Sequence, residues 1–173
     1  TLLNQQNSSG LRFIALCPTT NCITRDWTPL EVKKFIGIIN KITDMKVVII
    51  GNDKTKDFTQ KVKEAGESNF TDLSGKTTIS QLAAVISKCY IVVSTNTGPA
   101  HLSYALNVPT ITLFFYNNIA KWGAKNYDIN RAIFRPDYIK AEEVFEELKI
   151  LDKTISDKNK QNGKEPEISL KRL

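Results

Sequence analysis

The residues best suited to chemistry lie in one short segment, Ser94–His101, which reads Ser-Thr-Asn-Thr-Gly-Pro-Ala-His. It follows an apolar, β-like run at 90–93 and precedes a helix-like run over Ala100–Leu106. Where a strand turns through small residues into a helix, the first N–H groups of the helix are free and, with the helix dipole, attract anions such as phosphate. Thr97 can cap this helix, and Pro99 suits its first turn. The segment therefore predicts an anion-binding site in an α/β domain.

Length and composition bound the class of protein. With 173 residues, of which 41% are hydrophobic and 24% charged, the chain can form one globular domain with a sizeable core. No apolar run approaches the roughly 20 residues of a membrane span, and Thr1–Gly10 lacks the apolar core of a signal peptide. Three cysteines and one histidine argue against a disulfide framework and a zinc site. We therefore expect a cytoplasmic protein without a metal.

The charge pattern is less specific. The net charge is +6, and lysines alternate with acids along helix-like stretches, which is typical of solvated helix faces. Anionic substrates, acidic lipid headgroups and nucleic acid stay open as partners on charge alone. Nucleic acid is the weakest of these, because basic residues do not combine with exposed aromatic residues in any one stretch. We expect no nucleic-acid partner.

Apolar strand-like runs alternate with amphipathic helix-like runs. The expected strands cover residues 12–16, 46–50, 69–73, 90–93 and 110–115. The expected helices follow the capping boxes Thr28–Glu31 and Thr78–Gln81, or span Asp53–Ala65, Ala100–Leu106 and Ala141–Leu151. This alternation predicts an α/β fold, a Rossmann-like parallel sheet with helices on both faces. Ligands of such sheets bind at the carboxyl ends of the strands, where the strand order switches.

The last residues differ in composition from the rest. We expect one Rossmann-like domain over residues 1–152 and a basic, flexible tail over residues 153–173, because the end of the chain is rich in Lys, Asn and Gly. A solvated extension is the simpler interpretation of this tail, and a peripheral contact with a membrane surface is the alternative. The chain begins with Thr1 rather than Met, which leaves open that it is part of a longer protein.

Several pieces, in order along most of the chain, resemble one known family. They are Arg25–Pro29, Leu73–Thr77, Asn96–His101 and Pro109–Phe114, followed by a closing helix from Ile139 to Leu151. Together they resemble the C-terminal half of the lipopolysaccharide heptosyltransferases, glycosyltransferase family 9. The resemblance implies the GT-B architecture, in which two Rossmann-like domains face each other and the C-terminal one holds the nucleotide sugar. The general base of the family, an Asp of the N-terminal domain, has no counterpart here, so no catalytic residue is assigned.

The resemblance also implies contacts with the donor diphosphate. The residues concerned are Thr19, Thr20, Arg25, Thr97, Gly98 and His101. Gly98 permits close approach of the backbone to a phosphate, and the Arg25 guanidinium can bind phosphate through paired donors. The alternative for Arg25 is a solvated loop cation, and for His101 a histidine that packs on the helix.

Further positions are expected to hold the sugar and the nucleoside. Asn96 stands where the family commonly has an Asp that contacts the sugar hydroxyls; Asn keeps hydrogen-bonding capacity but loses the charge. Asp53 or Asp57 would bind the ribose, although Asp53 could instead cap a helix. The base pocket would be lined, mostly through backbone atoms, by Gly75, Lys76 and Thr77.

The resemblance therefore implies the donor-binding domain of an inverting bacterial glycosyltransferase without its acceptor domain. Heptose or a related sugar would pass from an ADP-heptose-like donor to a lipid-anchored lipopolysaccharide core, at the inner face of the cytoplasmic membrane, and no cofactor is expected. Two alternatives stay open. One is another GT-B sugar-nucleotide enzyme, such as an epimerase or a transferase that uses a different nucleotide. The other is a non-catalytic domain that binds a nucleotide or glycan.

Overall fold

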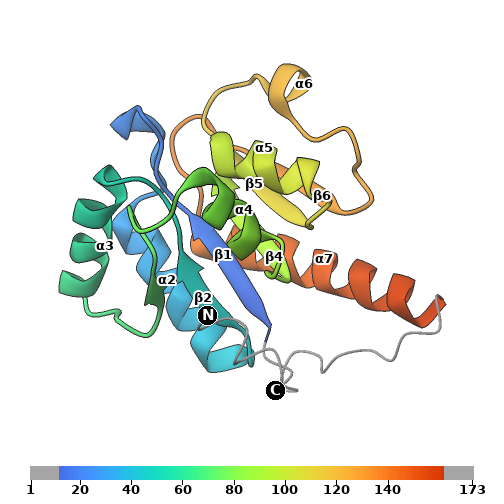
Figure 1. Cartoon of the computed structure of the whole chain (residues 1–173), viewed down its shortest axis with the longest axis horizontal. Helices are drawn as coiled ribbons and strands as arrows, with labels where there is room; N and C mark the ends of the chain where they lie inside the picture. Colours follow the sequence, from blue (N-terminus) through green and yellow to red (C-terminus); the bar gives the residue numbers. More distant parts are fainter. Residues whose placement is uncertain (1–11, 162–173) are drawn as a thin grey trace.

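The computed structural model describes residues 12–161. Its centre is a six-stranded sheet in the order β3-β2-β1-β4-β5-β6, in which every neighbouring pair of strands is parallel (Figure 1). The strands are β1 (Phe13–Cys17), β2 (Lys46–Ile49), β3 (Thr71–Asp72), β4 (Ile91–Thr95), β5 (Thr110–Phe114) and β6 (Asn130–Phe134). The helices are η2 (Ile23–Arg25), α2 (Pro29–Ile42), α3 (Lys54–Glu64), α4 (Ile79–Ile86), α5 (Gly98–Ala105), α6 (Ile119–Trp122) and α7 (Ala141–Gln161). The predicted α/β, Rossmann-like fold is confirmed.

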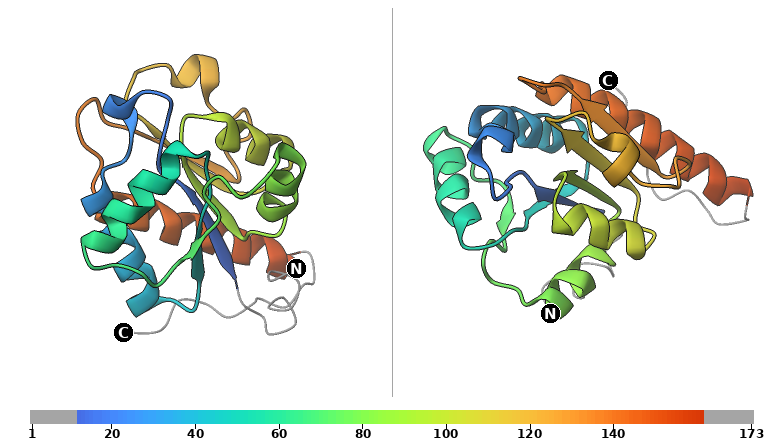
Figure 2. Two further views of the ribbon diagram at one scale, coloured as in Figure 1. Left: turned by 60° about the vertical axis from the view of Figure 1, so that its left-hand side comes forward. Right: turned by 90° about the horizontal axis from the view of Figure 1, so that it is seen from above.

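The helices cover both faces of the sheet, as expected. Because successive side chains of a strand point to opposite faces, Ile14 and Leu16 of β1 join one core cluster, while Phe13, Ala15 and Cys17 join the other. The first cluster packs against α2, α3 and α7, and the second against α4 and α5. Figure 2 shows α2 and α7 on one side of the sheet and α4 and α5 on the other.

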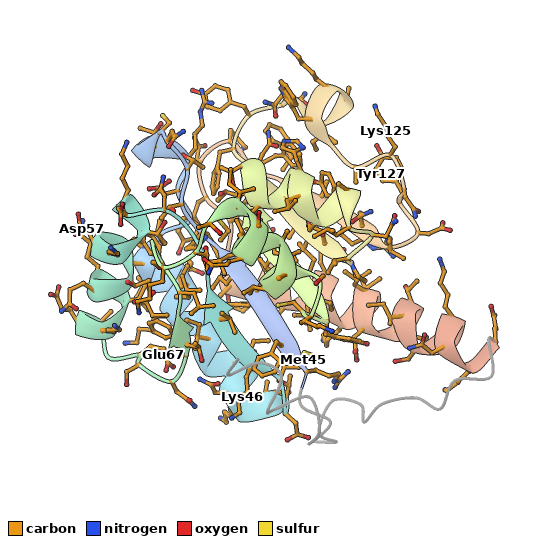
Figure 3. The ribbon with its side chains drawn as sticks, in the orientation of Figure 1. Met45, Lys46, Asp57, Glu67, Lys125 and Tyr127 are labelled. Carbon is orange, nitrogen blue, oxygen red and sulfur yellow. The ribbon has the colours of Figure 1, made fainter. Side chains whose placement is uncertain are left out.

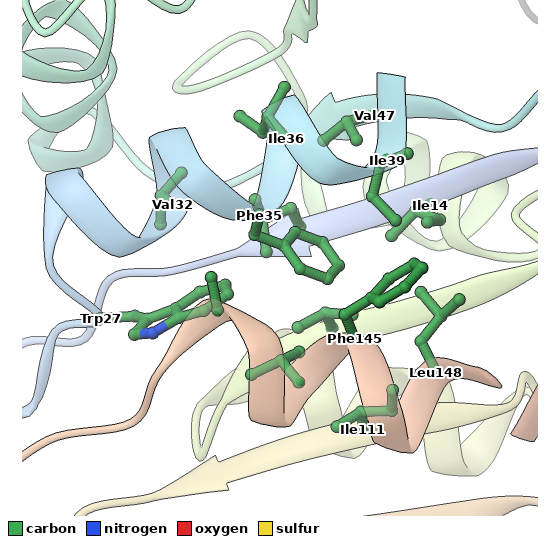
Figure 4. Close-up of a cluster of buried hydrophobic side chains, with 14 of the residues drawn as sticks. Ile14, Trp27, Val32, Phe35, Ile36, Ile39, Val47, Ile111, Phe145 and Leu148 are labelled. Carbon is green, nitrogen blue, oxygen red and sulfur yellow. The ribbon is translucent and has the colours of Figure 1, made fainter. Parts of the chain in front are cut away.

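The larger core centres on the contact between α2 and α7. Trp27 and Phe35 pack with their ring centroids 5.5 Å apart, and Phe145 and Leu148 of α7 face them across the cluster (Figure 4). The Trp27 indole N–H donates to the Ile139 carbonyl at 2.8 Å, so this side chain is fully buried with its polar atom satisfied. Trp27 is therefore a packing residue.

A buried carboxylate joins the starts of the same two helices. The Thr28 hydroxyl accepts from the Glu31 N–H at 3.3 Å, which is half of the predicted capping box. The Glu31 carboxylate does not return to Thr28. It accepts instead from the Ala141 N–H at 2.6 Å, from Lys34 at 2.7 Å and from the Tyr138 hydroxyl. Glu31 thus caps α7 across the core, and this part of the capping-box prediction is wrong.

A buried ion pair also holds α7, at the end of the sheet opposite to Glu31. Arg12 donates to Asp152 at 2.8 Å, and the Tyr90 hydroxyl donates to the same oxygen at 2.7 Å. The Arg12 guanidinium also lies 4.7 Å from the centroid of the Tyr90 ring. Burial, first of all, raises the pKa of Tyr90, and the Asp152 carboxylate adds to the effect. This cluster ties α7 to β1 and to the start of β4.

Several elements differ from the sequence-based expectation, and the short helices η2 and α6 were not predicted. The pattern predicts that the last helix ends at Leu151, but α7 continues to Gln161, because Asp152 is anchored to Arg12 and Ile155 packs against the core. Residues 153–161 are therefore helical, the rest of the expected tail lies outside the described residues, and the division of the chain at residue 152 stays a prediction. The edge strand β6 was not predicted, because its apolar residues do not alternate with polar ones: Asn130 and Ile133 are buried, whereas Ala132 is exposed.

The Glu31 network predicts a pH dependence of stability. Burial opposes ionisation of Glu31, but hydrogen bonds from Lys34, Tyr138 and the Ala141 N–H outweigh it and lower its pKa. A carboxyl with a lowered pKa stabilises the fold above its unfolded-state pKa of about 4.3, and this contribution disappears as the pH falls through the folded-state value. We expect the free energy of unfolding to fall more steeply between about pH 5 and pH 3 for the native chain than for Glu31→Gln.

Urea denaturation at stepped pH measures this difference. Glu31→Ala, which also leaves the Ala141 N–H unpaired, is expected to lose about 1–3 kcal/mol at neutral pH. Parallel pH profiles for the native chain and Glu31→Gln would contradict the assignment.

Candidate functional site

A crevice opens where the strand order reverses, between β1 and β4. The chain leaves β1 toward α2 on one face of the sheet and leaves β4 toward α5 on the other, so the two loops diverge above the strand ends. A cavity of about 290 Å³ lies there. Its lining comes from Cys17 and residues 19–21 at the end of β1 and after it, 51–52 after β2, 77–79 and Leu82 around the start of α4, and 97–99 at the start of α5. The cavity thus lies at the carboxyl ends of the strands, where ligands of such sheets bind.

The start of α5 presents backbone rather than side chains to this cavity. The helix begins at Gly98, Pro99 has no N–H, and the first hydrogen bond of the turn runs from the Ala100 N–H to the Thr97 carbonyl at 3.0 Å. A Cβ atom placed on Gly98 would meet no heavy atom within 4 Å. The Gly98 amide therefore borders open space at the positive end of a helix, an arrangement that favours an anion.

The threonine hydroxyls of the site are used within the protein. The Thr97 hydroxyl does not cap α5 but donates to the Thr95 carbonyl at 3.2 Å, so the predicted side-chain cap is wrong. Thr19 pairs with the Thr55 hydroxyl at 2.7 Å, and the Thr20 hydroxyl donates to the Cys22 carbonyl at 2.6 Å. The hydrogen bonds of Thr19 and Thr20 hold the loop after β1 in place. A hydroxyl has only one proton to donate, so these groups are occupied within the protein.

One wall of the cavity is apolar, and the sequence did not point to it. Ile79 is 81% exposed, although it is a large hydrophobic residue, and it lines the cavity with Leu82. Its exposure follows from its place as the first residue of α4, directly after the Thr78 cap. Other lining residues outside the prediction are Cys17, Asn21, Asn52, Thr78 and Pro99. The cavity thus offers an apolar surface at α4 and amide donors at α5.

Arg25 lies farther along the loop after β1 that carries Thr19 and Thr20. It ends η2, it is exposed, and its guanidinium stacks on the Tyr116 ring with the Cζ atom 4.1 Å from the ring centroid. Arg25, Asn96 and Thr20 line a second, small cavity of about 30 Å³. Thr20 also lines the larger cavity, so the two cavities are neighbours at this residue.

A third cavity, of about 360 Å³, lies on the other side of Thr20. It is lined by Thr19, Thr20 and Asp26 together with residues of α3, which include Asp57 (Figure 3). Asp26 accepts from the Thr20 N–H at 2.5 Å; burial raises the pKa of Asp26 although these hydrogen bonds oppose the rise. Asp57 therefore faces a different cavity from the one at the strand switch.

Four predicted site residues line none of these three cavities. Asp53 pairs with Lys56 at 2.7 Å on the surface. Gly75 adopts φ +62° and donates its N–H to the Gly51 carbonyl at 2.9 Å, so it shapes a turn. The Lys76 ammonium donates to the Asp72 carbonyl at 2.7 Å. His101 is half-buried between the rings of Tyr104 and Trp122, at 5.7 Å from each centroid. The loop at Gly75 reaches the site through Thr77.

Titratable groups are scarce at the strand switch. Burial raises the pKa of the Cys17 thiol, which keeps this lining residue neutral. Within residues 12–161 no cluster of His, Cys, Asp and Glu side chains could hold a metal ion. None of the helices described is long and apolar enough to cross a membrane.

Comparison with solved structures finds the same fold. ADP-heptose lipopolysaccharide heptosyltransferase II of Escherichia coli superposes with a TM-score of 0.76 at 20% identity, over 91% of this chain and 51% of that one. The E. coli heptosyltransferase WaaC with ADP gives 0.72 at 18% identity, over 82% of this chain and 45% of that one. The chain corresponds to about half of each structure.

Comparison of sequences finds the same group of proteins. The lipopolysaccharide core heptosyltransferase OpsX of Haemophilus influenzae is 44% identical over 48 residues, 28% of this chain and 14% of the relative. Lipopolysaccharide heptosyltransferase 3 of E. coli is 27% identical over 110 residues, 61% of this chain and 32% of the relative. The chain thus spans a third or less of the length of these curated relatives in the matched regions.

The family model for glycosyltransferase family 9 (heptosyltransferase) matches residues 2–154, which is most of the chain. With the parallel sheet, the strand switch and the open start of α5, this match identifies the chain as a member of glycosyltransferase family 9.

Proposed function

We propose that this chain is the donor-binding part of an inverting glycosyltransferase, and that it binds an ADP-activated heptose or related sugar in the cavity between β1 and β4. The observation that carries the proposal is the Gly98 amide, which borders open space at the start of α5 in a cavity of about 290 Å³. Family membership supports glycosyl transfer, and a structural neighbour was solved with ADP.

The diphosphate would lie between the start of α5 and the loop after β1. The Gly98 N–H and the positive helix end would contact one phosphate, and the Arg25 guanidinium would reach the other from the far side of Thr20. When the bond between sugar and phosphate breaks, negative charge grows on the departing diphosphate. Groups already fixed in position stabilise such charge without reorganisation, and this would be the main contribution of the chain to the rate.

The nucleoside would occupy the opposite end of the cavity. Ile79 and Leu82 offer an apolar surface on which a planar base can pack, and Thr77 and Asn52 border it with polar groups. Asp53 and Asp57 line other regions in the free chain, so the ribose contact stays a prediction for either residue.

The rest of the reaction would depend on a second domain. We propose that an acceptor-binding domain outside this chain supplies the base that deprotonates the acceptor hydroxyl, and that the acceptor is a lipid-anchored lipopolysaccharide core. The reaction would then take place at the inner face of the cytoplasmic membrane. Anion binding by backbone amides and Arg25 requires no cofactor.

A donor with a different nucleotide is the second candidate. The fold also superposes on a UDP-GlcNAc 2-epimerase of Methanocaldococcus jannaschii with a TM-score of 0.55 at 13% identity. Calorimetry of the chain with ADP and with UDP separates the two candidates. We expect ADP to bind more tightly than UDP, with an affinity that is micromolar or weaker. Tighter binding of UDP would favour the second candidate, and binding of neither would refute a nucleotide-binding role.

Arg25→Ala tests the diphosphate contact. A charge-assisted hydrogen bond at a partly exposed site predicts a loss of ADP affinity of about five- to thirtyfold. Lys41→Ala is the matched control, because it removes one exposed positive charge near the end of α2. Calorimetry at constant ionic strength should show that the control binds ADP like the native chain. Equal affinity of Arg25→Ala and the native chain would remove Arg25 from the site.

Gly98→Ala separates a binding role from a structural one. Its backbone suits any residue and its Cβ would meet no protein atom, so we expect stability to rise by about 0.4–1 kcal/mol. ADP affinity should fall at least about tenfold, because the methyl group blocks approach to the amide. Gly37→Ala, inside α2, should gain similar stability and keep ADP binding. Unchanged ADP binding by Gly98→Ala would place the phosphate elsewhere.

A further inference from the structure

The charge of Arg25 is not paired within the part of the chain that the structure describes. Its guanidinium forms no ion pair and donates to no oxygen atom within residues 12–161. The other arginines of this range, Arg12, Arg131 and Arg135, each pair with a carboxylate. The N–H donors of Arg25 are therefore available to an acceptor that the described chain does not supply.

The carboxylate next to Arg25 in the sequence is turned to a different cavity. Asp26 accepts from the Thr20 N–H at 2.5 Å and lines the cavity at α3. Arg25 instead lines the small cavity of about 30 Å³, together with Tyr116. The fold thus separates two opposite charges that are neighbours along the chain, and Asp26 does not neutralise the guanidinium through an ion pair.

Hydrogen bonds fix the backbone that carries Arg25. Its N–H donates to the Cys22 carbonyl at 2.9 Å, and the Trp27 N–H donates to the Pro18 carbonyl at 2.8 Å. The buried Trp27 indole anchors the end of this loop in the core. These bonds hold the backbone only. An arginine side chain has several further rotatable bonds, and ordering them when a ligand binds costs conformational entropy.

An aromatic contact from a different loop orders this side chain. The Arg25 Cζ atom lies 4.1 Å from the centroid of the Tyr116 ring. A cation over an aromatic face is attracted by the electrons of the ring, and this interaction needs no oxygen acceptor. Tyr116 therefore restricts the guanidinium while its capacity to bind phosphate is retained.

Tyr116 follows β5, and hydrogen bonds hold its own backbone. The Tyr116 carbonyl accepts from the Asn118 N–H at 2.8 Å, and the Phe114 carbonyl accepts from the Arg135 N–H at 3.1 Å. The Tyr116 side chain is 54% exposed, so it contributes to the surface beside the small cavity rather than to the core. The ring is thus a fixed surface against which Arg25 packs.

The strand order places this contact at the proposed site. Because β4 lies between β1 and β5 in the sheet, a contact between the loops after β1 and β5 spans the carboxyl end of β4. The helix with the open start at Gly98, α5, follows β4. Figure 1 shows η2 and the segment between β5 and α6 at the same end of the molecule. Arg25 in this position can meet a diphosphate that the Gly98 amide binds.

We propose that Tyr116 is a positioning residue, which holds the Arg25 guanidinium across the carboxyl end of β4 with its N–H donors free for the donor diphosphate. The inference rests on the proposed function and goes beyond it, because it adds a residue that acts on the diphosphate through Arg25. Tyr116 itself makes no contact with the nucleotide. A guanidinium that is already ordered loses less conformational entropy on binding, so its hydrogen bonds contribute more to the affinity.

Calorimetry of the 173-residue chain with ADP tests this proposal through a double-mutant cycle. Tyr116→Ala should lower the affinity for ADP by about three- to tenfold, because the guanidinium loses its contact with the ring. In a chain that already carries Arg25→Ala, the same change should alter the affinity by less than about twofold, because the side chain that Tyr116 holds is then absent. A residue that touched the nucleotide directly would cause the same loss in both chains.

Two further variants serve as controls. Tyr116→Phe keeps the ring and should bind ADP within about twofold of the native chain. Tyr127→Ala removes another exposed tyrosine, which lines none of the three cavities around the loop after β1, and should bind ADP like the native chain. Thermal unfolding of each variant verifies that the fold is intact.

Three results would each overturn the role of Tyr116 and leave nucleotide binding standing. They are native affinity in Tyr116→Ala, an equal loss with and without Arg25, and a loss in Tyr116→Phe or Tyr127→Ala as large as that in Tyr116→Ala. Failure of the native chain to bind ADP would instead refute the proposed function.

Discussion

The site depends on the reversal of strand order between β1 and β4. The chain crosses from β1 to one face of the sheet and from β4 to the other, so no helix covers the carboxyl ends of these two strands. Three parts of the candidate site border this opening. They are the amide at the start of α5, the loop that carries Thr20 and Arg25, and the exposed Ile79. A sheet with a single winding direction would have covered these ends.

The use of hydrogen-bonding groups separates the scaffold of the site from its open positions. The hydroxyls of Thr19, Thr20 and Thr97 bind other protein atoms. The Glu31 carboxylate accepts from the Ala141 N–H at the start of α7, and a buried ion pair joins Arg12 to Asp152 in the middle of the same helix. These satisfied groups hold the loops rigidly, since a buried polar group without a partner costs free energy. Beside the largest opening of the strand switch, the start of α5 stays uncovered, because no protein atom lies within 4 Å of a Cβ placed on Gly98.

Sequence reasoning succeeded where a local pattern decides the structure. The capping box at Thr78–Gln81 forms as predicted, because both of its hydrogen bonds lie within four residues. The box at Thr28–Glu31 forms only in half, because Ala141 competes for the Glu31 carboxylate from the other end of the chain. The edge strand β6 was missed for a related reason, since its pairing with β5 forms a strand from a sequence without a clear alternation of apolar and polar residues.

The sequence by itself determined the alternation of buried strands and amphipathic helices, and hence the parallel sheet. It also located the turn at Gly98 where α5 begins. Both features depend on residues that are neighbours along the chain. Only the tertiary structure decided which of the predicted residues border a common cavity. It brought Arg25 to Tyr116 and to a cavity that Asn96 also lines, and it directed His101 toward aromatic rings and Lys76 toward a carbonyl. Such contacts join residues from loops after different strands, and no spacing along one segment encodes the distance between them.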